Sequence, residues 1–255
     1  MYRLYIVEGL PCSGKSTVSE FAAGVLENDH KVIFYDEGSG AHPADYEFHA
    51  FLSNEDIKLF SERERREILE CSERTVNGWV MSLSDFTGSL FKKLLAFKIY
   101  DFLPWEKESP VMLEKWREFK QNADKDAVYV FNCVFLQNPM CETMMRFGFD
   151  TDKSFEYIRN IADIVREMEP YVIYLKNDDI AEAVKRTAKE RKGWLEAVID
   201  YHVGGAYGKS INADGFDGYI KCLEERQRRE LEILSRLEID SMVIENAHYD
   251  WTSAY

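Results

Sequence analysis

Short apolar runs alternate with helical patterns along most of the chain. Residues 2–8 form an apolar run rich in strand-favouring residues, and residues 15–26 after it are expected to form a helix. Further strands are predicted at 31–35, 127–134, 171–175 and, with a weaker pattern, 241–245. Nearly continuous apolar strands separated by helices are typical of a parallel sheet covered on both faces. The pattern therefore predicts an α/β fold.

The long interval 36–126 has a helical pattern rather than a loop pattern. Ser53 or Asn54 is positioned to cap a helix that continues to residue 70, with acidic residues in its first turn. Residues 83–103 contain an apolar helical face. We therefore expect 1–255 to form a single domain with a helical insert at about 45–125, between strands two and three.

The last third of the chain contains two clear helical patterns. Asp178 or Asp179 is expected to cap a helix that follows the fourth strand, and residues 217–236 form a mixed-charge amphipathic pattern. Within it, 226–229 (RQRR) is interpreted as a solvated face. The glycine-rich stretch 204–218 is the best candidate for a mobile loop.

Composition and charge then exclude several functions. The 255 residues include 46 Asp and Glu against 32 Lys and Arg, a formal net charge of −14. Because phosphate backbones are bound by basic surfaces, no nucleic-acid partner is expected. A polyanion that binds to this acidic chain must therefore be small, and a short local motif must hold it.

Cysteine usage and hydropathy bear on the compartment. The five cysteines form no C-x-x-C pair, which favours free thiols in a reducing cytoplasm. No apolar run approaches the roughly 18 residues of a membrane span, and the first apolar stretch is too short for a secretion signal. We therefore expect a cytoplasmic protein with no membrane association.

One motif carries specific chemistry. Residues 9–17 satisfy G-x-x-x-x-G-K-[ST], between a predicted strand and a predicted helix. In such a phosphate loop, backbone N–H groups and the helix N-terminus face phosphate oxygens. Lys15 is expected to reach the β- and γ-phosphates of ATP, and the Ser16 hydroxyl to bind Mg²⁺. The residues expected to bind the cofactor are Gly9, Pro11, Cys12, Ser13, Gly14, Lys15, Ser16 and Thr17. The alternative is a glycine-rich turn that binds no nucleotide.

Two acids follow the second predicted strand. Because ligands bind at the carboxyl ends of parallel strands, Asp36 and Glu37 are expected beside the phosphate loop. There they could accept a hydroxyl proton from an acceptor or position a magnesium-bound water, with Asp36 as the candidate metal group. The alternative is an ordinary acidic turn.

A basic helix follows the fourth strand. We interpret about 178–193 as a lid in which Arg186, Lys189 and Arg191 could neutralise charge on a transferred phosphoryl group. The alternative is a surface helix whose basic side chains pair with neighbouring glutamates. No guanine-specifying N-K-x-D follows a strand, which disfavours a GTPase.

The chain resembles the P-loop nucleoside and nucleotide kinase superfamily of the thymidylate-kinase and deoxynucleoside-kinase type. The matching segments are EGLPCSGKST, the DEG after strand two, and YVIYLKNDDIAEAVKRTAKER. Chloramphenicol-type antibiotic phosphotransferases are similar over the same segments. The resemblance implies a P-loop NTPase fold with strand order 2-3-1-4-5. It also implies Glu37, with Asp36 close by, as base or acceptor-binding group, and Arg186 and Arg191 as phosphate-contacting lid residues.

The chain departs from that family at several positions. Asn132 lies near the end of strand three, where such kinases commonly carry an acid, so the metal would rely on Ser16 and the acids after strand two, or catalysis would be weak. Gln137 and Asn138 follow and could bind an acceptor. His42 and Asp45, in a Gly- and Pro-containing loop, are further acceptor-binding candidates. Structural roles are the alternative for each of them.

The preferred function is an ATP-dependent small-molecule kinase that uses Mg²⁺ and transfers the γ-phosphoryl group of ATP. The acceptor would be a neutral hydroxyl on a nucleoside or antibiotic-like alcohol, or else a nucleotide phosphate, bound between the DEG turn and the insert. The alternatives are a P-loop hydrolase or switch and a nucleotide-binding protein with a degenerate site. Residues 246–251 are a plausible purine-binding neighbourhood, and a homodimer is possible through the aromatic insert.

Overall fold

The computed structural model describes residues 2–38, 40 and 42–245. The chain divides into two compact units, the first formed by 1–37 with 123–255 and the second by 38–122. The second unit overlaps the insert expected at about 45–125. Each unit is described separately below.

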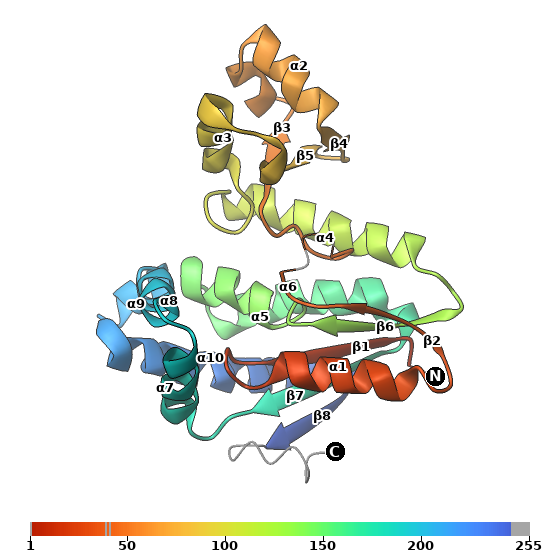
Figure 1. The fold of residues 1–255 in the computed structure, drawn as a ribbon, viewed down its shortest axis with the longest axis vertical. Helices are drawn as coiled ribbons and strands as arrows, with labels where there is room; N and C mark the ends of the chain where they lie inside the picture. The colour runs from red at the N-terminus through yellow and green to blue at the C-terminus, as the bar shows by residue number, and fades with distance from the viewer. Residues whose placement is uncertain (1, 39, 41, 246–255) are drawn as a thin grey trace. The chain divides into compact units, whose positions relative to one another are not determined.

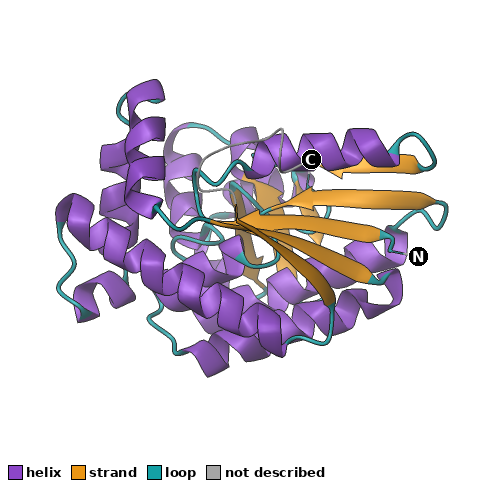
Figure 2. Cartoon of the chain, turned by 90° about the horizontal axis from the view of Figure 1, so that it is seen from below, coloured by secondary structure: helices purple, strands orange, loops and turns teal. Residues whose placement is uncertain are grey.

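The first unit contains a five-stranded parallel sheet (Figures 1 and 2). Its strands are β1 (Leu4–Gly9), β2 (Lys31–Tyr35), β6 (Ala127–Asn132), β7 (Pro170–Lys176) and β8 (Asp240–Glu245). They lie in the order β2-β6-β1-β7-β8, and every neighbouring pair is parallel. In chain order this is 2-3-1-4-5, so the predicted order is confirmed. Every residue of β6 is buried, as expected for an inner strand covered on both faces.

Helices cover both faces of this sheet. The helices of this unit are α1 (Lys15–Leu26), α5 (Gln137–Met140), α6 (Thr151–Val165), α7 (Ile180–Glu190), α8 (Trp194–Val203), α9 (Ala206–Ser210) and α10 (Gly215–Arg236), with a π-helical turn at Cys141–Arg146. On one face, Val18 of α1 packs with Val7 and Ile173 of the sheet. On the other face, the Tyr174 hydroxyl donates to Glu230 of α10 at 2.6 Å. Figure 1 shows α1 in front of the sheet and α10 behind it.

The buried side of α10 contains a charged pair. Arg226 Nε donates to Glu230 Oε1 at 2.6 Å, and both side chains are fully buried. The solvated face predicted for 226–229 is therefore wrong at its first two residues, because Gln227 is buried as well. The helical repeat turns these two positions toward the sheet, and the intrahelical pair compensates the buried charge.

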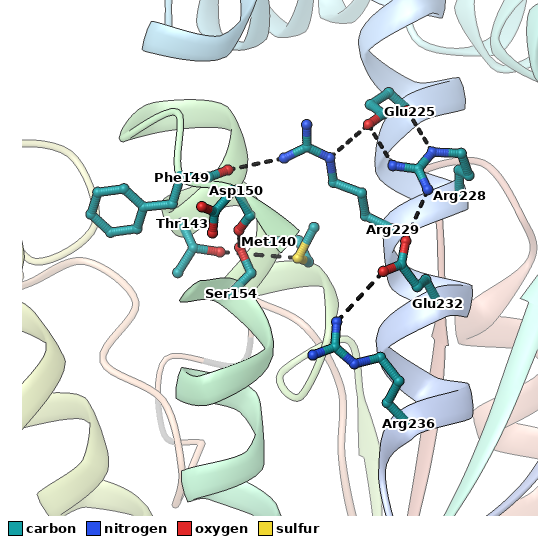
Figure 3. Close-up of polar contacts among 10 residues, drawn as sticks. All are labelled: Met140, Thr143, Phe149, Asp150, Ser154, Glu225, Arg228, Arg229, Glu232 and Arg236. Atoms are coloured by element: carbon teal, nitrogen blue, oxygen red, sulfur yellow. Dashed lines mark hydrogen bonds and ion pairs between the residues drawn. The ribbon is translucent and has the colours of Figure 1, made fainter. Parts of the chain in front are cut away.

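The other side of α10 is joined to the start of α6 by polar contacts (Figure 3). Arg229 Nη1 donates to the carbonyl oxygen of Phe149 at 2.9 Å. Glu225 accepts from both Arg228 and Arg229, so one carboxylate orients two guanidinium groups. Arg228 is exposed, in agreement with the predicted solvated face.

The glycine-rich stretch 204–218 is largely helical, so the mobile loop predicted there is wrong. It contains α9 and the first turn of α10. A Cβ on Gly205 would lie 2.2 Å from the Met145 carbonyl oxygen, and one on Gly208 would lie 2.4 Å from that of Val203. These glycines therefore permit close backbone packing rather than flexibility.

The second unit combines helices with a small antiparallel sheet. Its strands are β3 (His49–Ser53), β4 (Ser72–Arg74) and β5 (Gly78–Ser82), in the order β3-β5-β4. Its helices are α2 (Glu62–Glu70), α3 (Gly88–Leu94) and α4 (Trp105–Asn122), with 3₁₀ turns at Asp56–Leu59, Leu83–Asp85 and Leu95–Phe97. The helices agree with the prediction of a helical insert. The antiparallel sheet was not predicted. Apolar runs this short do not distinguish a strand from a buried helical segment.

The core of the second unit explains its apolar pattern. Leu52 of β3, Phe86, and Leu90 and Leu94 of α3 are buried in one cluster. The predicted apolar face over 83–103 is therefore confirmed. The aromatic side chains of Trp79, Phe91 and Phe97 pack against the same cluster.

The helix expected from Ser53 or Asn54 starts later. Ser61 caps α2 through a capping box, in which its side chain accepts from Glu64 N and its own N–H donates to the Glu64 carboxylate at 2.9 Å. Ser53 instead donates its hydroxyl to Asp56 at 2.5 Å, before a 3₁₀ turn. In contrast, Asp179 accepts from the N–H of Glu182 at 3.0 Å, so one of the two predicted caps of α7 is confirmed.

No helix in the described part of the chain combines the length and apolar character that a membrane crossing requires. The five cysteines are free thiols.

Candidate active site

The loop between β1 and α1 is curled by residues with positive φ. Gly9, Cys12 and Gly14 have φ values of 143°, 68° and 90°. A Cβ at Gly9 would lie 2.6 Å from the Leu175 carbonyl oxygen and 2.9 Å from Ser13 Oγ. Glycine is therefore required there, and the loop closes tightly at the first turn of α1. Together with the sheet order, this strand–loop–helix unit defines a P-loop NTPase fold.

Lys15 folds back along the loop. Its Nζ donates to the Leu10 carbonyl oxygen at 2.9 Å, and the side chain is buried. An ammonium group has three donors, so this contact leaves donors for an anion. Ser13 Oγ is buried with no hydrogen-bond partner in the described part of the chain, and Ser16 and Thr17 are exposed. These groups, with the N-terminus of α1, fit the phosphates of a nucleotide.

The structure brings the two predicted acids beside two amide side chains. Asn132 Nδ2 donates to Asp36 Oδ1 and, at 3.3 Å, to Ser16 Oγ. Gln137 Nε2 donates to Glu37 Oε1 at 2.9 Å. The carboxyl ends of β2 and β6 and the start of α1 therefore form one polar cluster, as the parallel register requires.

Cys133 adds a second donor to Glu37. Its φ of 58° turns the chain directly after β6, and its thiol hydrogen-bonds to Glu37. Burial first, and then the nearby Glu37 charge, raise the pKa of this thiol well above its usual range. Cys133 therefore stays protonated and donates, and Glu37 is held as an acceptor.

Glu8, which was not predicted as a site residue, holds the backbone of the segment that carries Gln137. It is fully buried in β1, and its carboxylate accepts from the backbone N–H groups of Phe135, Leu136 and Gln137 at 2.7, 2.9 and 3.0 Å. Burial raises its pKa to about 7, against the lowering effect of these hydrogen bonds. The signal for such a role was an acid at the end of an otherwise apolar strand.

Part of the predicted lid lies near the phosphate loop. The Cys12 thiol hydrogen-bonds to Thr187 of α7, and burial raises its pKa, while Lys15 and Arg191 act in the opposite direction. Arg191 follows the last residue of α7, and Arg186 and Lys189 are exposed on that helix. The N-terminal part of α7 is held by Ile180, which is buried in one cluster with Leu10.

The remaining candidates have local contacts. Asn138 N donates to the Cys133 carbonyl oxygen at 3.2 Å. His42 and Asp45 belong to the second unit, where His42 Nδ1 accepts from Ala44 N at 3.1 Å and Asp45 Oδ1 accepts from Tyr46 N at 2.9 Å. Burial and the nearby Lys115 charge lower the pKa of His42 to about 3.

The metal ion and the purine base were also considered in the sequence analysis. In the described residues, no three His, Cys, Asp or Glu side chains gather as a metal-binding group. Magnesium at a phosphate loop needs fewer protein ligands, because water and phosphate oxygens complete its shell. The purine-binding neighbourhood expected at 246–251 lies outside the described residues.

No protein-family model matches the sequence, and no curated protein matches it. One solved structure similar to this chain is the thymidylate kinase from Candida albicans. The two are 12% identical with a TM-score of 0.41, over 99% of this chain and 88% of that chain. This likeness is too distant to transfer residue roles, so the assignment of the fold rests on the sheet order and the loop described above.

Proposed function

We propose that this protein is an ATP-dependent phosphotransferase that acts on the hydroxyl group of a small molecule. The observation that carries the proposal is the polar cluster at the strand ends, where Asn132 donates to Ser16 of the phosphate loop and to Asp36, and Gln137 donates to Glu37. A phosphate loop alone serves many NTPases, but an acid held beside it can accept the proton of an acceptor hydroxyl. The loop residues Gly9, Pro11, Cys12, Ser13, Gly14 and Thr17 would hold the phosphates of ATP.

Glu37 is the proposed general base. It is exposed, and it accepts from Gln137 and from the Cys133 thiol, so its orientation is defined before an acceptor arrives. The acceptor hydroxyl would give its proton to the Glu37 carboxylate as its oxygen bonds to the γ-phosphorus and the bond to the β-phosphate oxygen breaks. Positioning of this kind and charge stabilisation supply most of the catalysis in phosphoryl transfer.

Ser16 Oγ and the Asp36 carboxylate are the groups that would hold Mg²⁺. Both are oxygen donors, they share Asn132 as a neighbour, and Ser16 is exposed, which fits the ligand preference of this cation. When bound, Mg²⁺ would neutralise phosphate charge. Lys15 would complement it from the loop side.

Arg186, Lys189 and Arg191 are the proposed phosphate-contacting residues of the lid at about 178–193. The support is the hydrogen bond between Cys12 and Thr187, together with the electrostatic influence of Arg191 on Cys12. Cationic side chains at this place would stabilise the charge that develops on the transferred group. The exposed position of Arg186 and Lys189 leaves both side chains accessible to a bound nucleotide.

A neutral or cationic acceptor is favoured over a nucleotide phosphate. Glu37 and Asp36 would repel a second anionic group, and the side chains that contact them, Gln137 and Asn132, carry no charge. Asn138 remains a further proposed acceptor-binding residue. His42 and Asp45 remain proposed acceptor-binding residues of the second unit. Nucleosides and aminoalcohols are therefore the classes to test first.

A second candidate is a nucleotide-binding protein with weak or no turnover. The observation that favours it is Asn132, a neutral side chain whose amino group occupies the space between Ser16 and Asp36. Without a carboxylate there, a cation would be held less strongly.

The test is release of ADP from ATP and Mg²⁺, with and without a panel of nucleosides and aminoalcohols. Release that depends on one acceptor, with the phosphorylated acceptor identified by mass spectrometry, is the expected result. Release without any acceptor would identify a hydrolase or switch instead. Tight ATP binding without release would support the second candidate.

A further inference from the structure

Asn132 is the least explained residue of the cluster. It is the last residue of β6, its side chain is fully buried, and its Nδ2 group donates to both Ser16 and Asp36. The other end of the same amide is different. Asn132 Oδ1 is buried and has no hydrogen-bond partner in the described part of the chain.

The chemistry of the neighbours explains this orientation. A carboxylate only accepts, so the Asp36 oxygen requires a donor, and the amino group of Asn132 supplies it. A buried carbonyl oxygen without a donor is unfavourable, so the present orientation satisfies one end of the amide at the expense of the other. The side chain thus has a reason to turn if another positive group reaches Asp36.

The amino group lies where an oxygen ligand of a cation would lie. It lies between Ser16 Oγ, the metal-binding hydroxyl of a phosphate loop, and Asp36 Oδ1. Mg²⁺ requires oxygen ligands at about 2.0–2.1 Å, so it would lie beside Ser16 Oγ, Asp36 Oδ1 and the amide rather than in the place of the amino group. A cation beside these oxygens would repel the amino group, and a half-turn of the amide would bring Oδ1 to the position that Nδ2 now holds, facing the cation.

We propose that Asn132 is a magnesium-responsive side chain, which directs Nδ2 to Ser16 and Asp36 in the absence of Mg²⁺ and turns to present Oδ1 when Mg²⁺ binds with nucleotide. This inference rests on the nucleotide site of the proposed function. It explains how a chain without an acid at this position can still hold the cation. It also makes cation binding depend on nucleotide, since the phosphates must help to displace the amide.

The first test measures Mn²⁺ binding without nucleotide, by electron paramagnetic resonance of the free ion. Asn132→Asp replaces the competing amino group by a second carboxylate, and we expect at least about tenfold tighter binding than in the wild type. Asn28→Asp is the matched control, because it makes the same change of charge at an exposed residue after α1. Equal affinity in these two variants would overturn the proposal.

The second test follows the amide itself. The side-chain ¹⁵N–H₂ signals of Asn132, identified by their absence in Asn132→Asp, are recorded with ADP and EDTA and then with ADP and Mg²⁺. We expect them to shift only when Mg²⁺ is present. If the chemical shifts stay the same on addition of Mg²⁺ while ADP binds, the proposed turn of the Asn132 amide is wrong, and the proposed function is unaffected. Failure of ADP to bind in either condition, measured by calorimetry, would overturn the proposed function and this inference with it.

Discussion

The two units of the chain use their polar side chains in different ways. In the first unit, Asp36 and Glu37, which follow one strand, contact amide side chains at the end of another strand. In the second unit, polar side chains close turns and helix ends. Glu114, for example, accepts from the N–H of Val76 at 2.5 Å, and Ser61 caps α2.

This difference follows from the two kinds of sheet. All strands of a parallel sheet end at one edge, so polar residues that follow separate strands gather there without pairing in the sheet. Antiparallel strands are joined by tight turns, and their polar residues satisfy the backbone of those turns. We place the proposed phosphate chemistry in the first unit, and four predictions test that proposal.

The largest expected effect is that of Glu37→Gln on turnover. Loss of a general base should lower kcat by about 10²- to 10⁴-fold, while the affinity for ATP should change little, because Glu37 is proposed to act on the acceptor. The measurement is steady-state turnover together with calorimetric ATP binding. Glu47→Gln, at an exposed glutamate of the second unit, is the matched control. An equal loss of ATP affinity would make Glu37 a nucleotide- or metal-binding group instead.

Lys15→Ala should have the next largest effect. Removal of the ammonium group that we propose binds the phosphates should reduce transfer by about 10²- to 10³-fold and weaken ATP binding. The circular dichroism spectrum should be unchanged, since α1 and the sheet keep their packing. Lys209→Ala, at an exposed position, serves as control. Unchanged turnover in Lys15→Ala would refute the phosphate-loop assignment.

Leu52→Ala tests the second unit. This side chain is fully buried in the core of that unit, so truncation should lower its stability by about 2–5 kcal/mol. Hydrogen exchange of the β3 and β5 amides measures the loss, and Leu59→Ala, 74% exposed, should change it by less than about 0.5 kcal/mol. ADP affinity should be retained under conditions where the variant is folded. A parallel loss of ADP affinity would contradict a nucleotide site confined to the first unit.

The smallest effect is a pH dependence at Glu8. Its pKa is raised from 4.5 to about 7 in the folded protein, so the folded state keeps a proton that the unfolded state loses between these values. The stability that Glu8 contributes is therefore fully present below about pH 4.5 and is lost as the pH rises to 7, by on the order of 3 kcal/mol. The free energy of unfolding of the wild type minus that of Glu8→Gln should fall over this interval. A rise would show that the three backbone N–H groups outweigh burial.

Much of the first unit could be predicted from the sequence, because its signals are local. The apolar runs of β1, β2 and β6 are continuous, and the phosphate loop has a fixed spacing. The second unit was less predictable. β4, with the sequence SER, contains no apolar residue and is a strand only because it pairs with β5. The burial of Glu8 and Arg226 was not predicted either. Glu8 is paired with a distant segment of the chain, and Arg226 lies on the packed face of α10 with Glu230.

The sequence by itself determined the class of fold, the strand order that the family resemblance implied, and the phosphate loop with its lysine. Those features depend on residue spacing and on apolar runs, which are properties of short segments. Only the tertiary structure decided which side chains meet at the strand ends. It placed Asn132 between Ser16 and Asp36, and it placed Gln137 and Cys133 on Glu37. The physical reason is that the register of a parallel sheet joins residues about one hundred positions apart, and no local pattern records that register.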